Sequence, residues 1–151
     1  MDKSPKEIFR LTSLIHAFLA VPITVIGLLI YYNIVSNPAP LEDDPLFLYI
    51  PIGIMMVAIL GARPIYNKII ASQLQSSFIV RMNAFLRATI IRDALFEAAG
   101  MAACVFAYLT GNNTLLLLIA IIVLQFFINR PSKQKIENDL RATKEELKEL
   151  D

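Results

Sequence analysis

The chain has 151 residues, of which 56% are hydrophobic and 18% are charged, and its net charge is +1. This composition is too apolar for an ordinary soluble domain, and the near-neutral charge gives no sign of nucleic-acid binding. The length allows one domain. The single cysteine, Cys104, excludes a disulfide framework and a thiolate metal site, and its apolar surroundings predict a buried structural thiol.

The apolar residues form three long runs without formal charge, at 11–35, 46–62 and 98–129. A hydrocarbon core about 30 Å thick requires roughly 20 helical residues to cross it. The third run contains a polar TGNNT turn at 110–114, which predicts the end of one crossing and the start of another. The first run is too long for a signal-peptide core and has no small-residue cleavage site, so we expect it to remain as a span.

We therefore predict an all-α integral membrane protein, with a four-helix transmembrane bundle in residues 1–130. The predicted spans are about 11–34, 46–66, 88–109 and 114–130.

Lysine and arginine are confined to alternate connections of the predicted bundle. They occur at 1–10, 63–91 and 130–135, whereas 36–45 and 110–114 have none. Cytoplasmic loops of membrane proteins carry an excess of these residues. We therefore predict that both termini are cytoplasmic.

The connection between the second and third predicted spans has apolar residues every three to five positions, which is typical of a helix. Two structures fit this pattern. The transmembrane helices could project beyond the inner leaflet and join near 72–77, or one amphipathic helix could lie in the membrane interface.

Beyond Pro131, which ends the last span, the polar sequence predicts a cytoplasmic helical tail at 131–151. Residues Thr143 to Glu146 have the form of a capping box, which indicates a second short helix. The apolar residues of the tail fall near one face; they are Ile136, Leu140, Leu147 and Leu150. A solvated amphipathic tail is the favoured interpretation, and a partner-binding or coiled-coil helix is the alternative.

The third predicted span carries two carboxylates one helical turn apart, Asp93 and Glu97. Glu97 falls about 10 Å inside the inner boundary of the membrane, given a rise of about 1.5 Å per residue. Charges at such depth cost several kcal/mol unless they are paired, so they usually face the interior of the bundle. We expect Arg92 to snorkel to the inner interface.

Depth also identifies partners for Glu97 on the other three spans, namely His16, Arg63 and Gln125. We predict that Glu97 binds His16 directly or through one water molecule, and that Asp93 meets Arg63 or water. On this interpretation Glu97→Ala destabilises the bundle and Asp93→Asn has little effect.

The predicted cluster allows two roles. It can bind a proton or cation, with His16 as a pH-sensitive neighbour, or it can fix the register of the helices. The second role is favoured because no polar pathway continues outward from Glu97.

Small and weakly polar residues form one stripe on the first predicted helix, and the third helix is rich in alanine. The stripe consists of Ser13, Ala17, Ala20, Thr24 and Gly27. Small residues let membrane helices approach closely. We therefore expect the first and third helices to form the tight centre, and the fourth to face lipid.

Two short motifs resemble the proton-carrying c subunit of rotary ATP synthases. They are Ala62-Arg63-Pro64, which is similar to that family's polar loop, and the Ala94–Ala98 segment. The resemblance implies that Glu97 is an ion carrier. The chain departs from the family in having few glycines in its second helix and a much longer connection. Small multidrug transporters also have four spans and one essential carboxylate, in the helix where this chain has His16.

Over its full length the chain is similar to small four-helix proteins of bacterial inner membranes. The motifs that carry this resemblance are 92–97 (R-x-A-L-x-E), 110–112 (TGN) and the Arg-Pro-Ser-Lys exit at 130–133. The resemblance implies the location and the helix order, and it assigns no biochemical activity.

The sequence contains no set of residues for catalysis. It has one histidine, no glycine-rich phosphate loop, no Ser/His/Asp arrangement and no metal-ligand spacing, so we expect neither enzyme activity nor a cofactor. Asp93, Glu97 and His16 are too few ligands to predict a metal site inside a bilayer. We expect a structural or accessory protein that contacts the lipid bilayer and either itself, as a homo-oligomer, or a larger membrane complex. The alternative is a small oligomeric transporter or proton/cation-coupled channel that uses Glu97.

Overall fold

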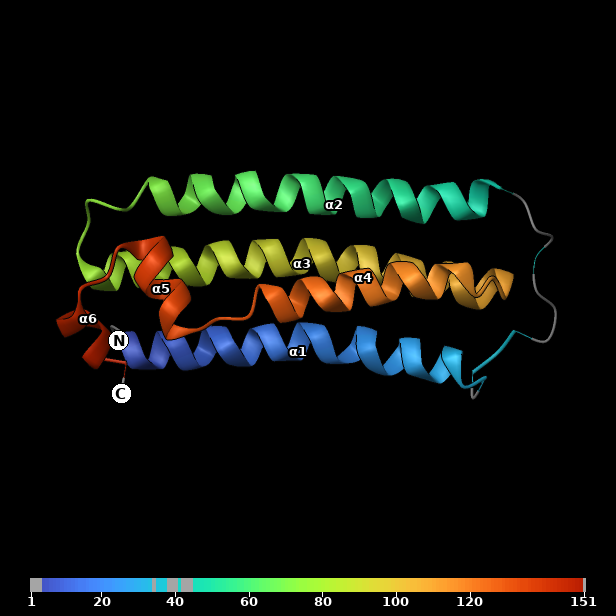
Figure 1. Ribbon diagram of the computed structural model, residues 1–151, viewed down its shortest axis with the longest axis horizontal. Coiled ribbons are helices and arrows are strands. Elements are labelled where there is room, and N and C mark those ends of the chain that lie inside the picture. Colours follow the sequence, from blue (N-terminus) through green and yellow to red (C-terminus); the bar gives the residue numbers. More distant parts are fainter. Residues whose placement is uncertain (1–3, 34, 38–40, 42–44, 151) are drawn as a thin grey trace.

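A computed structural model describes the whole chain except residues 1–3, 34, 38–40, 42–44 and 151. The described residues form helices only, as predicted, and the four longest lie side by side (Figure 1). These are α1 (Pro5–Tyr31), α2 (Leu46–Ala71), α3 (Phe78–Thr110) and α4 (Thr114–Ile128), followed by α5 (Lys133–Leu140) and α6 (Lys144–Lys148). The start of α1, the α2–α3 connection and the short helices α5 and α6 lie at one end of the bundle. The acidic residues of the first loop, 42–44, fall outside the described residues.

Local sequence signals set several helix ends. At the start of α1, the Glu7 N–H donates to Ser4 Oγ (3.3 Å) and the Ser4 N–H donates to the Glu7 carboxylate (2.8 Å), which completes a capping box. α3 ends at Gly111, whose φ of 65° is the left-handed conformation that glycine adopts at low cost. The Thr114 N–H then donates to Asn112 Oδ1 (2.9 Å) as α4 begins. The predicted TGNNT turn is therefore confirmed.

The long connection contains two helices with a break between them. α2 continues to Ala71, and α3 begins at Phe78. This is the first of the two predicted alternatives, in which the helices extend and join near 72–77. A single amphipathic helix does not cover the connection.

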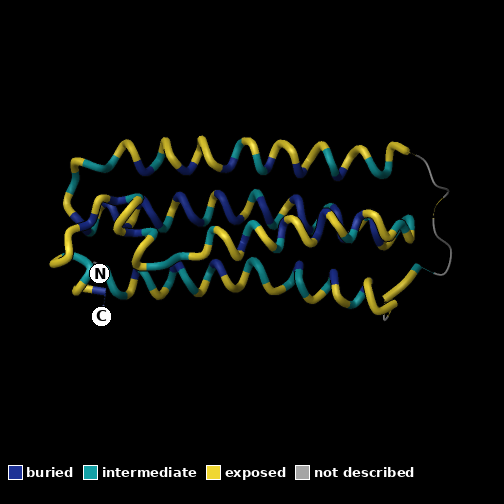
Figure 2. The backbone as a smooth tube through the Cα atoms, viewed as in Figure 1, coloured by how far each residue is buried: buried dark blue, intermediate teal, exposed yellow. Residues whose placement is uncertain are grey.

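α3 is the central helix, because it packs against α1, α2, α4 and α5. Its buried side chains contribute to two apolar clusters, and Figure 2 shows buried positions along most of its length. The long core occupies most of the bundle and includes Ile23, Phe96 and Ile122. The terminal cluster lies at the end that carries α5 and α6, and includes Ile8 and Phe85.

α1 and α3 pack closely, as expected, but α1 buries mainly larger side chains, and Gly27 is the one residue of the predicted stripe that is buried. α1 buries Thr12, His16 and Ile23, whereas Ala17 of the predicted stripe is exposed. Ile23, a larger side chain, fills the space beside Gly100 of α3. Ala17 instead lines a groove between α1 and α4.

The fourth helix was expected to face lipid, but α4 also contributes side chains to the core. It buries Ile119 and Ile122, which lie against the two glycines where the helices come closest. A Cβ atom at Gly27 would lie 2.8 Å from Ile119 Cγ2. One at Gly100 would lie 2.9 Å from Ile23 and 3.1 Å from Ile122. Glycine therefore permits close packing of α1, α3 and α4.

The C-terminal segment packs onto the bundle, so the prediction of a solvated tail is wrong. Ile136, Leu140 and Leu150 are buried in the terminal cluster. Arg81 of α3 donates a hydrogen bond from Nη1 to the Leu140 carbonyl (2.6 Å) and forms an ion pair with Glu146. The tail docks because the extended ends of α1, α2 and α3 leave an apolar surface that these side chains cover. The predicted capping box at Thr143 is confirmed.

Two described helices, α1 and α2, are long and apolar enough to cross a membrane. A third candidate is α4 with α5, which are bent by 77° at the break that contains Pro131. α3 carries five charged residues, which lower its hydropathy; they are Arg81, Arg87, Arg92, Asp93 and Glu97. The apolar helices indicate that the protein is located in a membrane.

We predict that Gly100→Ala lowers the midpoint of thermal unfolding in detergent, by an overpacking cost of about 1–3 kcal/mol. The new methyl group would meet Ile23 and Ile122, whose branched side chains have few alternative rotamers. Gly53→Ala is the matched control, because a Cβ atom there meets nothing within 4 Å. Equal unfolding temperatures for the two variants would contradict close packing at Gly100.

Candidate functional site

Three charged or titratable side chains meet inside the bundle, and we call them the buried charge cluster: His16 of α1 with Arg92 and Asp93 of α3. His16 Nδ1 lies 2.6 Å from Asp93 Oδ2. Arg92 donates from Nε to the other carboxylate oxygen, Asp93 Oδ1 (3.0 Å), and its Nη2 forms an ion pair with the same oxygen at 2.9 Å. The Asp93 side chain has no exposed surface, so both carboxylate oxygens depend on these partners.

The end of α4 completes the cluster with backbone carbonyl groups. His16 Nε2 lies 3.1 Å from the Phe126 carbonyl oxygen, and Arg92 Nη2 donates to the Asn129 carbonyl oxygen at 2.9 Å. The last carbonyls of a helix have no partner within it and carry partial negative charge. The C-terminus of α4 thus supplies hydrogen-bond acceptors to both side chains.

Hydrogen-bond acceptors lie beside both nitrogens of the His16 ring. Each ring nitrogen faces an acceptor, the Asp93 carboxylate on one side and a carbonyl on the other. A neutral imidazole has a single N–H, whereas the imidazolium has two. A ring that carries a proton on each nitrogen can donate to both acceptors at once.

The predicted pairing of the carboxylates is wrong. Asp93, not Glu97, binds His16, and Asp93 meets neither Arg63 nor the surface. Arg92 is buried and does not snorkel. Glu97 is half-buried and makes no hydrogen bond or ion pair with any residue that the structure describes.

The angular position of each residue on α3 explains this exchange. Successive helical residues turn by about 100°, so Glu97 is rotated about 40° from Asp93. Asp93 lies within the buried face, together with Thr89, Phe96 and Gly100. The rotation takes Glu97 to the edge of that face. The prediction was based on depth in the membrane, which is similar for the two carboxylates and gives no information on their angular positions around the helix axis.

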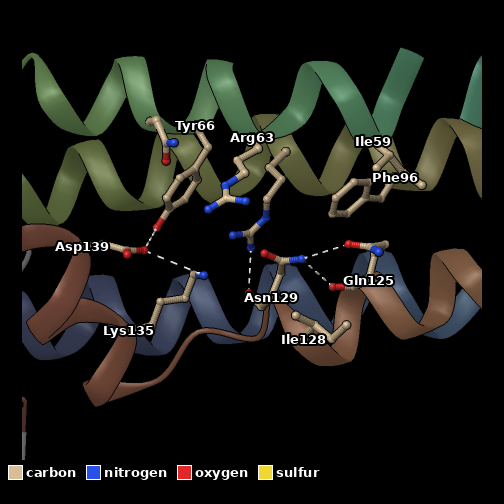
Figure 3. A pocket seen from close by; sticks show the side chains of 11 residues that line it. Ile59, Arg63, Tyr66, Phe96, Gln125, Ile128, Asn129, Lys135 and Asp139 are labelled. Carbon is tan, nitrogen blue, oxygen red and sulfur yellow. Dashed lines mark hydrogen bonds and ion pairs between the residues drawn. The ribbon is translucent and has the colours of Figure 1, made fainter. Parts of the chain in front are cut away.

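A polar pocket of about 470 Å³ adjoins the buried charge cluster, between α2, α3, α4 and α5 (Figure 3). Arg63, which we had expected near Glu97, lines it on α2, and Arg92 lines it on α3. Gln125, also an expected partner of Glu97, lines it on α4 and accepts from the Asn129 side-chain amide. The pocket therefore brings together the predicted supporting residues, but around Arg92 and not around Glu97.

Tyr66 joins this pocket to the docked tail. Its hydroxyl donates to Asp139 Oδ2 (2.6 Å), and Lys135 Nζ lies 3.8 Å from the same carboxylate oxygen. Arg92 and Lys135 also lie over the Tyr66 ring, at 5.0 and 5.6 Å from its centroid, which adds cation–π attraction. Desolvation by burial lowers the pKa of Lys135, and the opposing effect of Asp139 is smaller.

Sequence reasoning missed Tyr66, Asn129, Lys135 and Asp139. Tyr66 resembles an ordinary apolar residue of a helical pattern, and its hydroxyl has no signal in hydropathy. Lys135 and Asp139 are spaced as an i,i+4 pair, which was a usable signal for a helix but not for its docking. Among the described residues, no three His, Cys, Asp or Glu side chains lie close enough to hold a metal ion.

Comparisons with protein families, with curated proteins and with solved structures found no match to this chain. The resemblances given above remain predictions. The site must therefore be interpreted from its own geometry.

We predict that Asp93→Asn destabilises the protein by about 3–5 kcal/mol, because removing one partner leaves buried cations uncompensated. Glu97→Gln is the matched control at one turn's distance, and we expect a change within about 0.5 kcal/mol. This order is the reverse of the one that the sequence suggested. Thermal or denaturant unfolding in detergent measures both, and a larger loss in Glu97→Gln would contradict the assignment.

Proposed function

We propose that α1 to α4 each cross a bacterial inner membrane and that both termini are cytoplasmic. The large apolar side chains on the outside of α1 support this, since they repeat along one face and are about half or more exposed; they are Leu14, Phe18, Val21, Val25 and Leu28. Soluble monomers rarely expose so large an apolar stripe. The basic residues at the adjoining ends of α2 and α3, such as Lys68 and Arg81, and those of the tail lie towards the opposite end of the bundle from the 110–114 turn, in keeping with the positive-inside rule.

Within that membrane the protein acts as a structural or accessory component. The observation that carries this proposal is the mutual pairing of the charges in the interior. Both nitrogens of His16 and both carboxylate oxygens of Asp93 are engaged in fixed contacts between three helices. Such pairing suits a contact that sets the register of helices, as in the best-attested role of buried polar groups.

The interior beyond the cluster also supports a structural role. From Phe96 towards the 110–114 turn, the buried side chains of the long core are apolar. A path for ions or protons needs polar groups or water along its length. The buried charge cluster is therefore closed on its outer side.

The surfaces left for contact with other molecules follow from the docking of the tail. The apolar face of the tail is buried in the terminal cluster. The outer faces of the helices and the exposed polar face of the tail are then available to a second copy or to a larger membrane complex; on the tail this face includes Glu137, Arg141 and Lys144.

The alternative is an oligomeric transporter or proton/cation-coupled channel that uses Glu97. The position of Glu97 favours it, because a half-buried carboxylate at the edge of α3 would be enclosed if a second copy packed there. Proton flux distinguishes the two functions.

The topology predicts which introduced cysteines react in intact cells. In a Cys104→Ser background, Asn113→Cys in the outer turn should react with a membrane-impermeant maleimide. Glu137→Cys in the tail should react only after the cells are permeabilised. Both side chains are exposed in the structure, so burial does not protect either of them. Labelling of Glu137→Cys in intact cells would exclude a cytoplasmic tail.

We further predict that proteoliposomes containing the wild-type chain show no more proton leak than empty vesicles, as measured with an enclosed pH-sensitive dye. Glu97→Gln should behave identically. A leak that is present in the wild type and abolished in Glu97→Gln would establish the channel or transporter in place of the accessory role.

A further inference from the structure

The polar pocket holds more positive charge than its own carboxylate balances. Arg63, Arg92 and Lys135 line it, against the one carboxylate of Asp139. Asp93 lies behind Arg92, outside the lining, and is also in contact with His16. The side chains that border this space thus carry an excess of positive charge.

Both guanidinium groups of the pocket have N–H donors without an acceptor among the described residues. Arg63 makes no hydrogen bond or ion pair with any described residue, and Figure 3 shows its guanidinium directed into the pocket. Arg92 uses Nε and Nη2 in the buried charge cluster, while its Nη1 group has no acceptor among the described residues. Lys135 approaches from α5, with the 3.8 Å contact to Asp139 as its ion pair.

We propose that the polar pocket is a binding site for a phosphate group. Arg92 is the fixed ligand, because the buried charge cluster holds it in place, whereas Arg63 and Lys135 close on the anion from α2 and α5. Donors that converge from three helices suit an oxyanion with more acceptor oxygens than a carboxylate has, and arginine recognises phosphate through paired N–H groups. This inference concerns a ligand site, and it holds whichever of the two functions the protein serves.

The shape of the pocket indicates how a phosphate-bearing molecule would lie. Its polar end, at Tyr66 and Asp139, is next to the docked tail (Figure 3). Towards its other end the lining is mostly apolar, with Ile59, Phe96 and Ile128 beside the side-chain amide of Gln125.

The apolar surface continues along α4 beyond the pocket. Ile128 is followed on the same face by the exposed side chains of Leu124 and Ile121. A phospholipid would place its phosphate between the cations and its acyl chains along this surface. A free phosphate ion would use the polar end alone.

The test uses the full-length wild-type protein, purified in a neutral detergent and stripped of lipid. It is titrated with dioctanoyl phosphatidylglycerol, with dioctanoylglycerol, which has the same chains without phosphate, and with inorganic phosphate. Calorimetric binding and the rise in unfolding temperature are the measurements. The variants are Arg63→Gln and Lys135→Gln, and Lys68→Gln is the control, since Lys68 is a basic residue of α2 that lies outside the pocket.

We expect phosphatidylglycerol to bind the wild type and to raise its unfolding temperature, while dioctanoylglycerol does neither. Loss of one charge-assisted hydrogen bond should raise the dissociation constant about tenfold or more in each pocket variant. Lys68→Gln should bind like the wild type. Arg63→Gln is the decisive variant, because Arg63 forms no hydrogen bond or ion pair with any described residue, and so its loss removes no such contact from the fold.

Comparison of the ligands in these titrations also identifies the source of the phosphate group. Binding of phosphatidylglycerol without binding of inorganic phosphate assigns the site to a lipid headgroup. Arg63-dependent binding of inorganic phosphate assigns it to a free anion. The proposal is overturned if neither ligand binds, if Arg63→Gln binds as well as the wild type, or if Lys68→Gln loses as much affinity as the pocket variants.

Discussion

The carboxylate of Asp93 has no exposed surface, and the free energy of removing its charge from water constrains the rest of the bundle. The chain offsets that cost with the guanidinium group of the neighbouring residue and the imidazole ring of His16 from α1. These two side chains in turn face the carbonyl groups that α4 leaves unpaired at its end. Because each contact requires a different helix, the axial positions of α1, α3 and α4 are set together. A shift of one helix by a single turn would leave at least one buried charge without a partner.

This constraint explains why the tail and the pocket occur where they do. Arg92 is held by Asp93 on one side and presents its remaining surface to Tyr66 and the polar pocket on the other. The hydroxyl of Tyr66 then reaches Asp139 in α5. Contacts therefore run without interruption from the centre of the bundle to its C-terminal helices. The same side chain that balances the interior carboxylate thus helps to place the tail.

Local chemistry made much of the fold predictable. The capping boxes at Ser4 and Thr143, the glycine at 111 and the break near 72–77 are encoded within a few residues of the helix ends that they define. Hydropathy likewise identified the apolar segments, because membrane helices differ so strongly from soluble ones in composition.

The pairing of side chains was harder to predict from the sequence, because it depends on the rotation of helices about their axes. Asp93 and Glu97 have the same charge and nearly the same depth, and a 40° rotation decides which one is buried. His16 was identified as a partner since it is the one histidine on the first span, but its carboxylate was not. The docking of α5 depends on a complementary surface formed by α1, α2 and α3, and no property of residues 133–150 alone describes that surface.

The composition of the terminal cluster has a consequence for the order in which the protein can be completed. Ile8, Tyr66 and Phe85 are synthesised well before Ile136 and Leu140, which cover them in the folded chain. Tyr66 and Asp139, which share a hydrogen bond, are 73 residues apart in sequence. During translation this apolar surface stays uncovered until the last helices emerge from the ribosome. A chain interrupted before α5 would keep that surface exposed, and chaperones or proteases that recognise exposed apolar residues could distinguish it from the finished protein.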